Sequence, residues 1–291
     1  TFVAFSYSTV NFLGGGETLN LTLQQGKRVK NYSFGLTEPY IFDRPMTVGF
    51  NVFDRKVNIP YLYSQLSKGI SLVYGMRWIE YWRFNLNYTF QNTTLDFPSY
   101  DDYGSNYYYN NPYFYAGTYH VSAIEPMLYR STIDSPLTPS RGTSYTAALK
   151  YAGSFLGGEV HLIRPRIDLA HYQPFISNHV LGFHVEYMIV KGMKGHAVPY
   201  WERFFLGGEQ SVRGYDFYTI GPRDENEILI GGQKSLVMNF EYIIPFGGPL
   251  YGIVFYDLGN TWLSGQKVNL KDVYTSTGLE VRVFVPALRV P

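Results

Sequence analysis

The chain has 291 residues, of which 18% are aromatic and only 16% are charged, and its formal net charge is +1. Such low charge with so much Tyr and Phe excludes a disordered chain, and the near-zero net charge excludes a global electrostatic field for nucleic acid. The sequence contains no cysteine, which excludes a disulfide scaffold and a Cys-ligated metal site.

Alternation of apolar and polar residues is the dominant pattern along the chain, and it predicts β-strands. The clearest case is WRFNLNYTFQ from Trp82 to Gln91, where Trp82, Phe84 and Leu86 point one way and Arg83 and Asn85 point the other. The predicted strands are Thr1–Phe12, Glu17–Gly26, Asn31–Asp43, Met46–Val57, Ser67–Ile79, Tyr81–Asp96, Gly117–Ser131, Gly142–Phe155, Gly158–Tyr172, His179–Val190, Gly232–Ile244, Leu250–Asn260 and Val273–Pro286.

Connections between these strands alternate between tight and long. Pro136–Gly142 and Phe246–Pro249 are tight, whereas Phe97–Ala116 and Lys191–Gly231 are long. Short turns at one rim and long loops at the other are typical of outer-membrane barrels. The chain has no run of 18 apolar residues, so the pattern predicts no transmembrane helix and leaves either a soluble all-β protein or a transmembrane β-barrel.

Three observations favour the barrel over a soluble sandwich. Many predicted strands alternate for 12 residues or more, whereas soluble strands average about 5–6. The polar positions carry amides, Thr and isolated charges, which suit a wet lumen. Aromatic residues gather near strand ends, as at Trp78 and Trp82, which suits membrane interfaces. We therefore predict an all-β fold, a transmembrane antiparallel up-and-down β-barrel over residues 1–291.

The segment Lys191–Gly231 is too long for a passive connection. Gly207, Gly208 and Gly221 are its candidate turn glycines, because glycine tolerates backbone angles that other residues disfavour. Arg213 stands between Val212 and Gly214, and a guanidinium buried in apolar surroundings needs carboxylate partners. Glu241 and Asp257 in the following strands are the candidate partners. The alternation of side chains along its strand puts Glu241 on the polar side, which is expected to face the lumen. Either the loop folds back into the barrel and is held by Arg213, or it is a surface loop with a solvated arginine.

Signals for chemistry are weak elsewhere. No nucleophile or zinc-protease motif is present, and the six histidines are scattered, with His179 and His184 on opposite faces of a strand. We therefore predict no enzymatic activity, no catalytic residue, no metal site and no cofactor.

Val212-Arg213-Gly214-Tyr215 resembles the VRG[FY] signature of the BamA-type outer-membrane insertase superfamily. The aromatic segment Pro199–Gly208 resembles the lead-in to that loop, and Asn239–Pro245 and Phe255–Trp262 resemble the two strands that follow it. Near the start, Asn11–Gly16 (NFLGGG) and Thr37–Tyr40 (TEPY) resemble shorter motifs of the family. The resemblance is spread over most of the chain.

The resemblance implies a 16-stranded barrel of which this chain supplies strands two to fourteen, which accounts for the odd count of thirteen. It implies that POTRA domains precede the barrel and are absent from this chain, and that residues 191–231 form a lumen-inserted signature loop. Phe255 shares the face of Asp257, so it is expected to stack on the guanidinium of Arg213.

The function implied is assembly and insertion of β-barrel proteins in the bacterial outer membrane, with substrate strands templated at a lateral seam. The implied partners are unfolded outer-membrane proteins, periplasmic chaperones, accessory assembly lipoproteins and the lipid bilayer, with no nucleic acid. Two alternatives remain open: a two-partner secretion transporter that exports an unfolded polypeptide through the same kind of barrel, and a passive porin, which should lack the signature loop.

Overall fold

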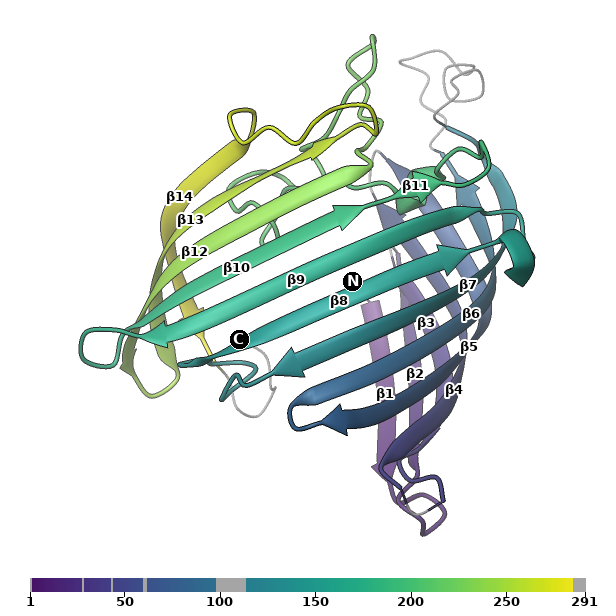
Figure 1. Ribbon diagram of the computed structural model, residues 1–291, viewed down its shortest axis with the longest axis horizontal. Coiled ribbons are helices and arrows are strands. Elements are labelled where there is room, and N and C mark those ends of the chain that lie inside the picture. The colour runs from purple at the N-terminus through teal and green to yellow at the C-terminus, as the bar shows by residue number, and fades with distance from the viewer. Residues whose placement is uncertain (1, 28, 43, 60–61, 98–113, 285–291) are drawn as a thin grey trace. The chain divides into compact units, whose positions relative to one another are not determined.

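The structure, a computed structural model, describes residues 2–27, 29–42, 44–59, 62–97 and 114–284, and its regular elements are almost all antiparallel strands (Figure 1). Thirteen of the described strands follow chain order, each hydrogen-bonded to its neighbours, and the two-residue β11 pairs with β9 off this path. This arrangement confirms the predicted up-and-down all-β fold. None of the described segments is a helix long and apolar enough to cross a bilayer.

The strands are 9 to 17 residues long, apart from β11, and over much of those lengths apolar and polar residues alternate. They are β1 (Phe2–Val10), β2 (Thr18–Gly26), β3 (Val29–Glu38), β4 (Met46–Ile59), β5 (Tyr63–Ile79), β6 (Trp82–Asp96), β7 (Gly117–Ser131), β8 (Gly142–Ala152), β9 (Leu162–Pro174), β10 (Val180–Ile189), β11 (Lys191–Gly192), β12 (Lys234–Gly247), β13 (Leu250–Trp262) and β14 (Tyr274–Val283).

Several predicted boundaries are wrong by three residues or more: β3 ends at Glu38 instead of Asp43, β5 starts at Tyr63 instead of Ser67, and β12 ends at Gly247 instead of Ile244. Strand β8 ends at Ala152 instead of Phe155, because a 3₁₀ turn (η2, Ser154–Leu156) follows it, and β9 starts at Leu162 instead of Gly158. Glycines at both ends of η2 have φ near +79°, a conformation that ends the extended backbone. The end of the last predicted strand, at residues 285 and 286, lies outside the described residues.

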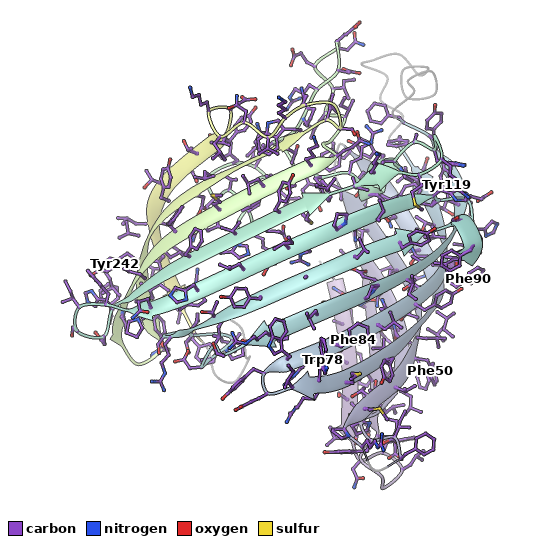
Figure 2. All side chains as sticks on the ribbon, in the orientation of Figure 1. Phe50, Trp78, Phe84, Phe90, Tyr119 and Tyr242 are labelled. Atoms are coloured by element: carbon purple, nitrogen blue, oxygen red, sulfur yellow. The ribbon has the colours of Figure 1, made fainter. Side chains whose placement is uncertain are left out.

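The described chain forms two compact units, and the first contains β1 to β6 and most of β7. Side chains of directly opposed residues share a face, and the register opposes Phe34 to Val52, Val52 to Ile70 and Ile70 to Phe90. These pairs define the apolar face of the unit, which also carries Phe50 and Phe84 (Figure 2). Val52, Leu72 and Phe90 are each about half exposed, so a continuous apolar surface is left uncovered.

The second unit contains β10, β12, β13, β14, most of β9 and the loop residues from 203 onward. Its apolar face carries Leu181, Phe240, Tyr242 and Val254, which follow from the register of β10, β12 and β13. The opposite face, called the polar face below, also holds a buried apolar cluster of Val180, Ile243 and Ile253. This cluster makes the polar face less uniformly wet than the alternation predicts.

The turn between β7 and β8 is organised by one carboxylate. Asp134 Oδ1 accepts hydrogen bonds from the backbone N–H groups of Ser135, Ser140 and Arg141 at 2.9–3.2 Å, and its Oδ2 accepts from the Ser140 hydroxyl. Although slight burial raises the pKa of Asp134, these hydrogen bonds outweigh it and lower the pKa from 3.8 to about 2.

We expect Asp134→Ala to loosen this turn. Amide exchange at Ser140 and Arg141 should accelerate about fivefold, because each lost hydrogen bond contributes about 1 kcal/mol. In the unmodified protein, Asp134 has a lower pKa in the folded turn than in the unfolded chain, so the unfolded chain binds a proton at a higher pH. The stability that Asp134 gives to the turn is therefore lost as the pH falls from about 4 to about 2. Asp134→Asn, which keeps an acceptor oxygen, should lose less protection and show no such pH dependence. Unchanged exchange in Asp134→Ala would contradict the assignment.

Candidate functional site

The loop between β11 and β12 is a folded element from residue 203 onward. Backbone bridges join Phe204 to Gly232, Leu206 to Ile220 and Arg223 to Leu229. The paired amides of Leu206 and Ile220 donate to each other's carbonyls at 3.0 and 2.9 Å. Because its own backbone hydrogen bonds are satisfied, the loop holds a defined shape against the sheet.

Apolar contacts attach this loop to the polar face of β12. Leu206, Val212 and Ile220 pack with Val237 into one buried cluster, in which Val212 is fully buried. Val237 is an apolar residue on the polar face of β12, between Ser235 and Asn239. That break in the alternation is the sequence signal that could have located the docking surface of the loop.

Arg213 is held first by Asp257 on β13, whose side chain is fully buried. The guanidinium donates from Nε to Oδ2 and from Nη2 to Oδ1, both at 2.7 Å, and the backbone N–H of Arg213 donates to Oδ2 at 3.1 Å. This is a bidentate, charge-assisted contact with a third hydrogen bond from the backbone.

Two further carboxylates complete the cluster. Arg213 Nη1 donates to Glu241 Oε1 on β12 at 2.7 Å and to Glu280 Oε2 on β14 at 2.8 Å. Arg282 on β14 contacts Glu280 Oε1 at 2.9 Å. The Arg213 Cζ atom lies 3.9 Å from the centroid of the Phe255 ring, a cation–π distance. Arg213 therefore ties the loop to β12, β13 and β14 together.

Asn239 connects the Arg213 cluster to His184 on β10 by hydrogen bonds. Its Nδ2 donates to Asp257 Oδ1 at 2.9 Å and to the Ser211 carbonyl oxygen at 2.8 Å, and its Oδ1 lies 2.9 Å from His184 Nδ1. His184 Nε2 in turn lies 3.1 Å from Asp168 Oδ2 on β9. Asn239, Glu280 and Arg282 were not singled out from the sequence as members of this cluster, and His184 was considered only as a possible metal ligand, because their meeting depends on the register of separate strands.

The remaining residues of the predicted signature lie around the arginine. Tyr215 donates its hydroxyl hydrogen to the Thr275 carbonyl at 3.2 Å and packs edge-on against Tyr274. Gly207 and Gly208 have φ of +107° and +98°, and Gly214 has +84°. Gly221 is different: its φ is not positive, and a Cβ there would approach Leu229 and Thr261 at 3.3 Å. Gly221 lies at a bend of the backbone, and it is close packing, without a positive φ, that favours glycine there.

We expect Gly207→Ala to undock the loop, at a cost of about 2 kcal/mol or more, because strain in the left-handed region alone costs about 1–3 kcal/mol. A Cβ at Gly207 would also lie 2.2 Å from the Asp216 carbonyl oxygen. Protease cleavage between residues 203 and 231 and the thermal midpoint would report the change. Gly265→Ala is the matched control, since no heavy atom lies within 4 Å of its Cβ. Equal behaviour of the two variants would count against the prediction.

Within the described ranges, no three His, Cys, Asp or Glu side chains gather as a metal-binding group. His179 contacts the Tyr242 hydroxyl at 2.5 Å on the apolar face, while His184 contacts Asp168 on the polar face. The two histidines therefore lie on opposite faces, as their spacing predicts. The arrangement around Arg213 offers ion pairing and packing, and it suits fixing a loop in place.

Comparison with known proteins identifies the family. The Omp85 superfamily domain matches residues 11–290. The outer membrane protein assembly factor BamA of Nitratidesulfovibrio vulgaris is 35% identical over 158 residues, covering 53% of this chain and 20% of the relative. BamA of Neorickettsia risticii is 29% identical over 292 residues, covering 97% of this chain and 38% of the relative. The chain thus spans well under half the length of these curated relatives.

Two solved structures share the fold. BamA from Haemophilus ducreyi lacking POTRA domains 1–3 superposes with a TM-score of 0.81 at 19% identity, over 98% of this chain and 64% of that one. CdiB from Acinetobacter baumannii gives a TM-score of 0.57 at 13% identity, over 98% of this chain and 51% of that one. The family match and the curated relatives show that this chain is a transmembrane β-barrel of the outer membrane. With nearly its whole length matched, the chain belongs to the Omp85 superfamily.

Proposed function

We propose that this chain is the barrel part of an outer-membrane protein assembly factor, which folds and inserts other β-barrel proteins without covalent chemistry. The names of the most similar relatives support assembly as the activity. The single structural observation that carries the proposal is the loop that Arg213 binds to three consecutive strands. Such a loop stiffens the wall that these strands form, and a passive pore does not require that stiffening.

The physical basis proposed for the activity is β-augmentation. A strand edge presents N–H and C=O groups that are costly to leave unpaired in lipid. An unfolded substrate strand that pairs with such an edge satisfies both sets of groups at once. We propose that the edge is a lateral seam of the complete barrel, and that the docked loop occupies the lumen and stiffens the wall formed by β12, β13 and β14.

The proposed partners follow from this activity. Unfolded outer-membrane proteins are the substrates, periplasmic chaperones deliver them, and accessory lipoproteins and POTRA domains complete the machine. Nucleic acid has no part, since the net charge of +1 provides no basic field. No residue is proposed to form a covalent intermediate.

Reconstitution of the full-length protein in liposomes tests the proposal. A urea-unfolded porin is added, and its folding is followed by its heat-modifiable mobility in gels. The expected result is faster porin folding than in protein-free liposomes, abolished when cysteines cross-link the first strand of the complete barrel to the last. Folding at the protein-free rate would refute assembly activity. Continued acceleration after cross-linking would refute the seam.

A two-partner secretion transporter is the second candidate, and the fold similarity to CdiB is the observation that favours it. In the same liposomes a transporter would move an unfolded polypeptide into the interior, where external protease cannot reach it. A passive porin would instead show steady ion conductance in planar bilayers. We rank assembly first because the curated relatives are assembly factors.

A further inference from the structure

The apolar face of the first unit changes to polar and charged residues near one end of four neighbouring strands. The apolar residues before the change are Tyr32, Val52, Ile70 and Phe90, on β3, β4, β5 and β6. Two residues further along each strand the same face carries Lys30, Asp54, Lys68 and Asn92, and Leu66 follows Lys68 on β5. Asp54 is directly opposite both Tyr32 and Lys68, and Lys68 is directly opposite Asn92, so the change comes one residue pair later on β3 than on the other strands. Such a change from apolar to charged residues marks the depth at which lipid tails give way to headgroups.

Positive charge exceeds negative charge at this line. Lys30 Nζ lies 2.7 Å and Lys68 Nζ lies 3.6 Å from the same oxygen, Asp54 Oδ2. Lys56 is directly opposite Lys30 on the same face, is exposed, and forms no ion pair with any residue that the structure describes. Asp54 therefore pairs with two of the three ammonium groups, and the four side chains together carry an excess of two positive charges on this face.

A groove leads from these lysines down the apolar face. It has a volume of about 700 Å³, and Leu23, Phe34, Val52, Ile70 and Phe90 line it. Asp54, Lys68 and Asn92 lie at its polar end. The groove therefore combines a surface suited to hydrocarbon with a cationic rim, and both features lie on one face of one unit.

We propose that Lys30, Lys56 and Lys68 bind the phosphate group of an anionic membrane lipid whose acyl chain lies in this groove. Like charges placed directly opposite destabilise a strand pair, so Lys30 and Lys56 need an anion to share. At headgroup depth the available anion is lipid phosphate, and each basic residue near an anionic membrane surface contributes about 1 kcal/mol of attraction. The proposal depends on the membrane location of the apolar face and is independent of the assembly function.

Native mass spectrometry of the full-length protein in neutral detergent tests the site. Dioleoyl phosphatidic acid is the probe, and dioleoyl phosphatidylcholine is the zwitterionic comparison. The protein should retain phosphatidic acid at least fivefold better than phosphatidylcholine. Lys56→Gln with Lys68→Gln should lower retention of phosphatidic acid about 25-fold, which is fivefold for each 1 kcal/mol lost, and Lys56→Arg with Lys68→Arg should restore it.

A matched control distinguishes binding at this site from non-specific attraction of the anionic lipid to lysines elsewhere on the protein. Lys267→Gln with Lys271→Gln removes the same charge from the loop between β13 and β14, and it should leave lipid retention unchanged. Folding of every variant is checked by heat-modifiable gel mobility. Equal losses in the control pair, or equal retention of the two lipids, would overturn the proposal. Displacement of phosphatidic acid by millimolar inorganic phosphate would also overturn it, because the site would then recognise free phosphate and not a lipid.

Discussion

Arg213→Ala is expected to release the docked loop and to destabilise the barrel by about 3–5 kcal/mol. The change leaves Asp257 fully buried and Glu241 largely buried without their cation, and removing one partner of a buried ion pair costs that much. Arg213→Lys should recover only part of the loss, because one ammonium group cannot donate in parallel to both oxygens of Asp257 while also reaching Glu241 and Glu280.

Protease cleavage between residues 203 and 231, together with thermal unfolding of the reconstituted protein, measures this effect. Arg223→Lys is the matched control: Arg223 lies in the same loop, and its guanidinium donates only to the backbone oxygens of Glu227 and Thr219. We expect Arg223→Lys to change the thermal midpoint little. If Arg213→Lys and Arg223→Lys behaved alike, the three carboxylates around Arg213 would not be what holds the loop.

An arginine placed in the middle of the apolar face is expected to cost about 2–4 kcal/mol, the range for lipid-facing positions near the bilayer midplane. Leu72→Arg on β5 tests this, because Leu72 is 49% exposed between Ile70 and Tyr74 on that face. Reversible urea unfolding in liposomes or micelles gives the free energy directly.

Ser71→Arg is the control one residue away. Ser71 is opposed by Asn51 on β4 and Thr89 on β6, so its side chain lies among polar neighbours. It should tolerate arginine with a loss of about 1 kcal/mol or less, as expected for a polar surface position. Similar losses for Leu72→Arg and Ser71→Arg would show that the two faces of β5 are in equivalent surroundings.

The alternation of residues predicted much of this fold because a strand with one lipid-facing surface must repeat every second residue. It placed Trp82, Phe84 and Leu86 on one face; the register opposes Phe84 to Met76 and Leu86 to Tyr74 on that face, whereas Trp82 pairs beyond a register shift between Arg77 and Ile79. The same alternation predicted the face of Glu241, and Arg213 contacts Glu241 on that face in the structure. Strand ends were predicted less well, as at β8, because Gly153 ends the strand through backbone angles that alternation does not encode.

The full membership of the Arg213 cluster was beyond prediction for a different reason. Alternation in β14 puts Glu280 and Arg282 on the same side of that strand, but their distance from Arg213 depends on how β13 and β14 align. Only the structure shows that Asn239 joins the Ser211 carbonyl, Asp257 and His184. A sequence gives the face of each residue, whereas its neighbours across strands require the register.

The contacts of Arg213 with β12, β13 and β14 have a consequence for how the wall is assembled. A slip of β14 by one residue would turn Glu280 and Arg282 towards lipid and bring Leu279 or Val281 opposite the guanidinium. The loop can therefore seat its arginine fully only when all three strands are aligned correctly. We therefore expect a barrel in which these strands are misaligned to keep an undocked, protease-sensitive loop, and docking of the loop to favour the correct alignment.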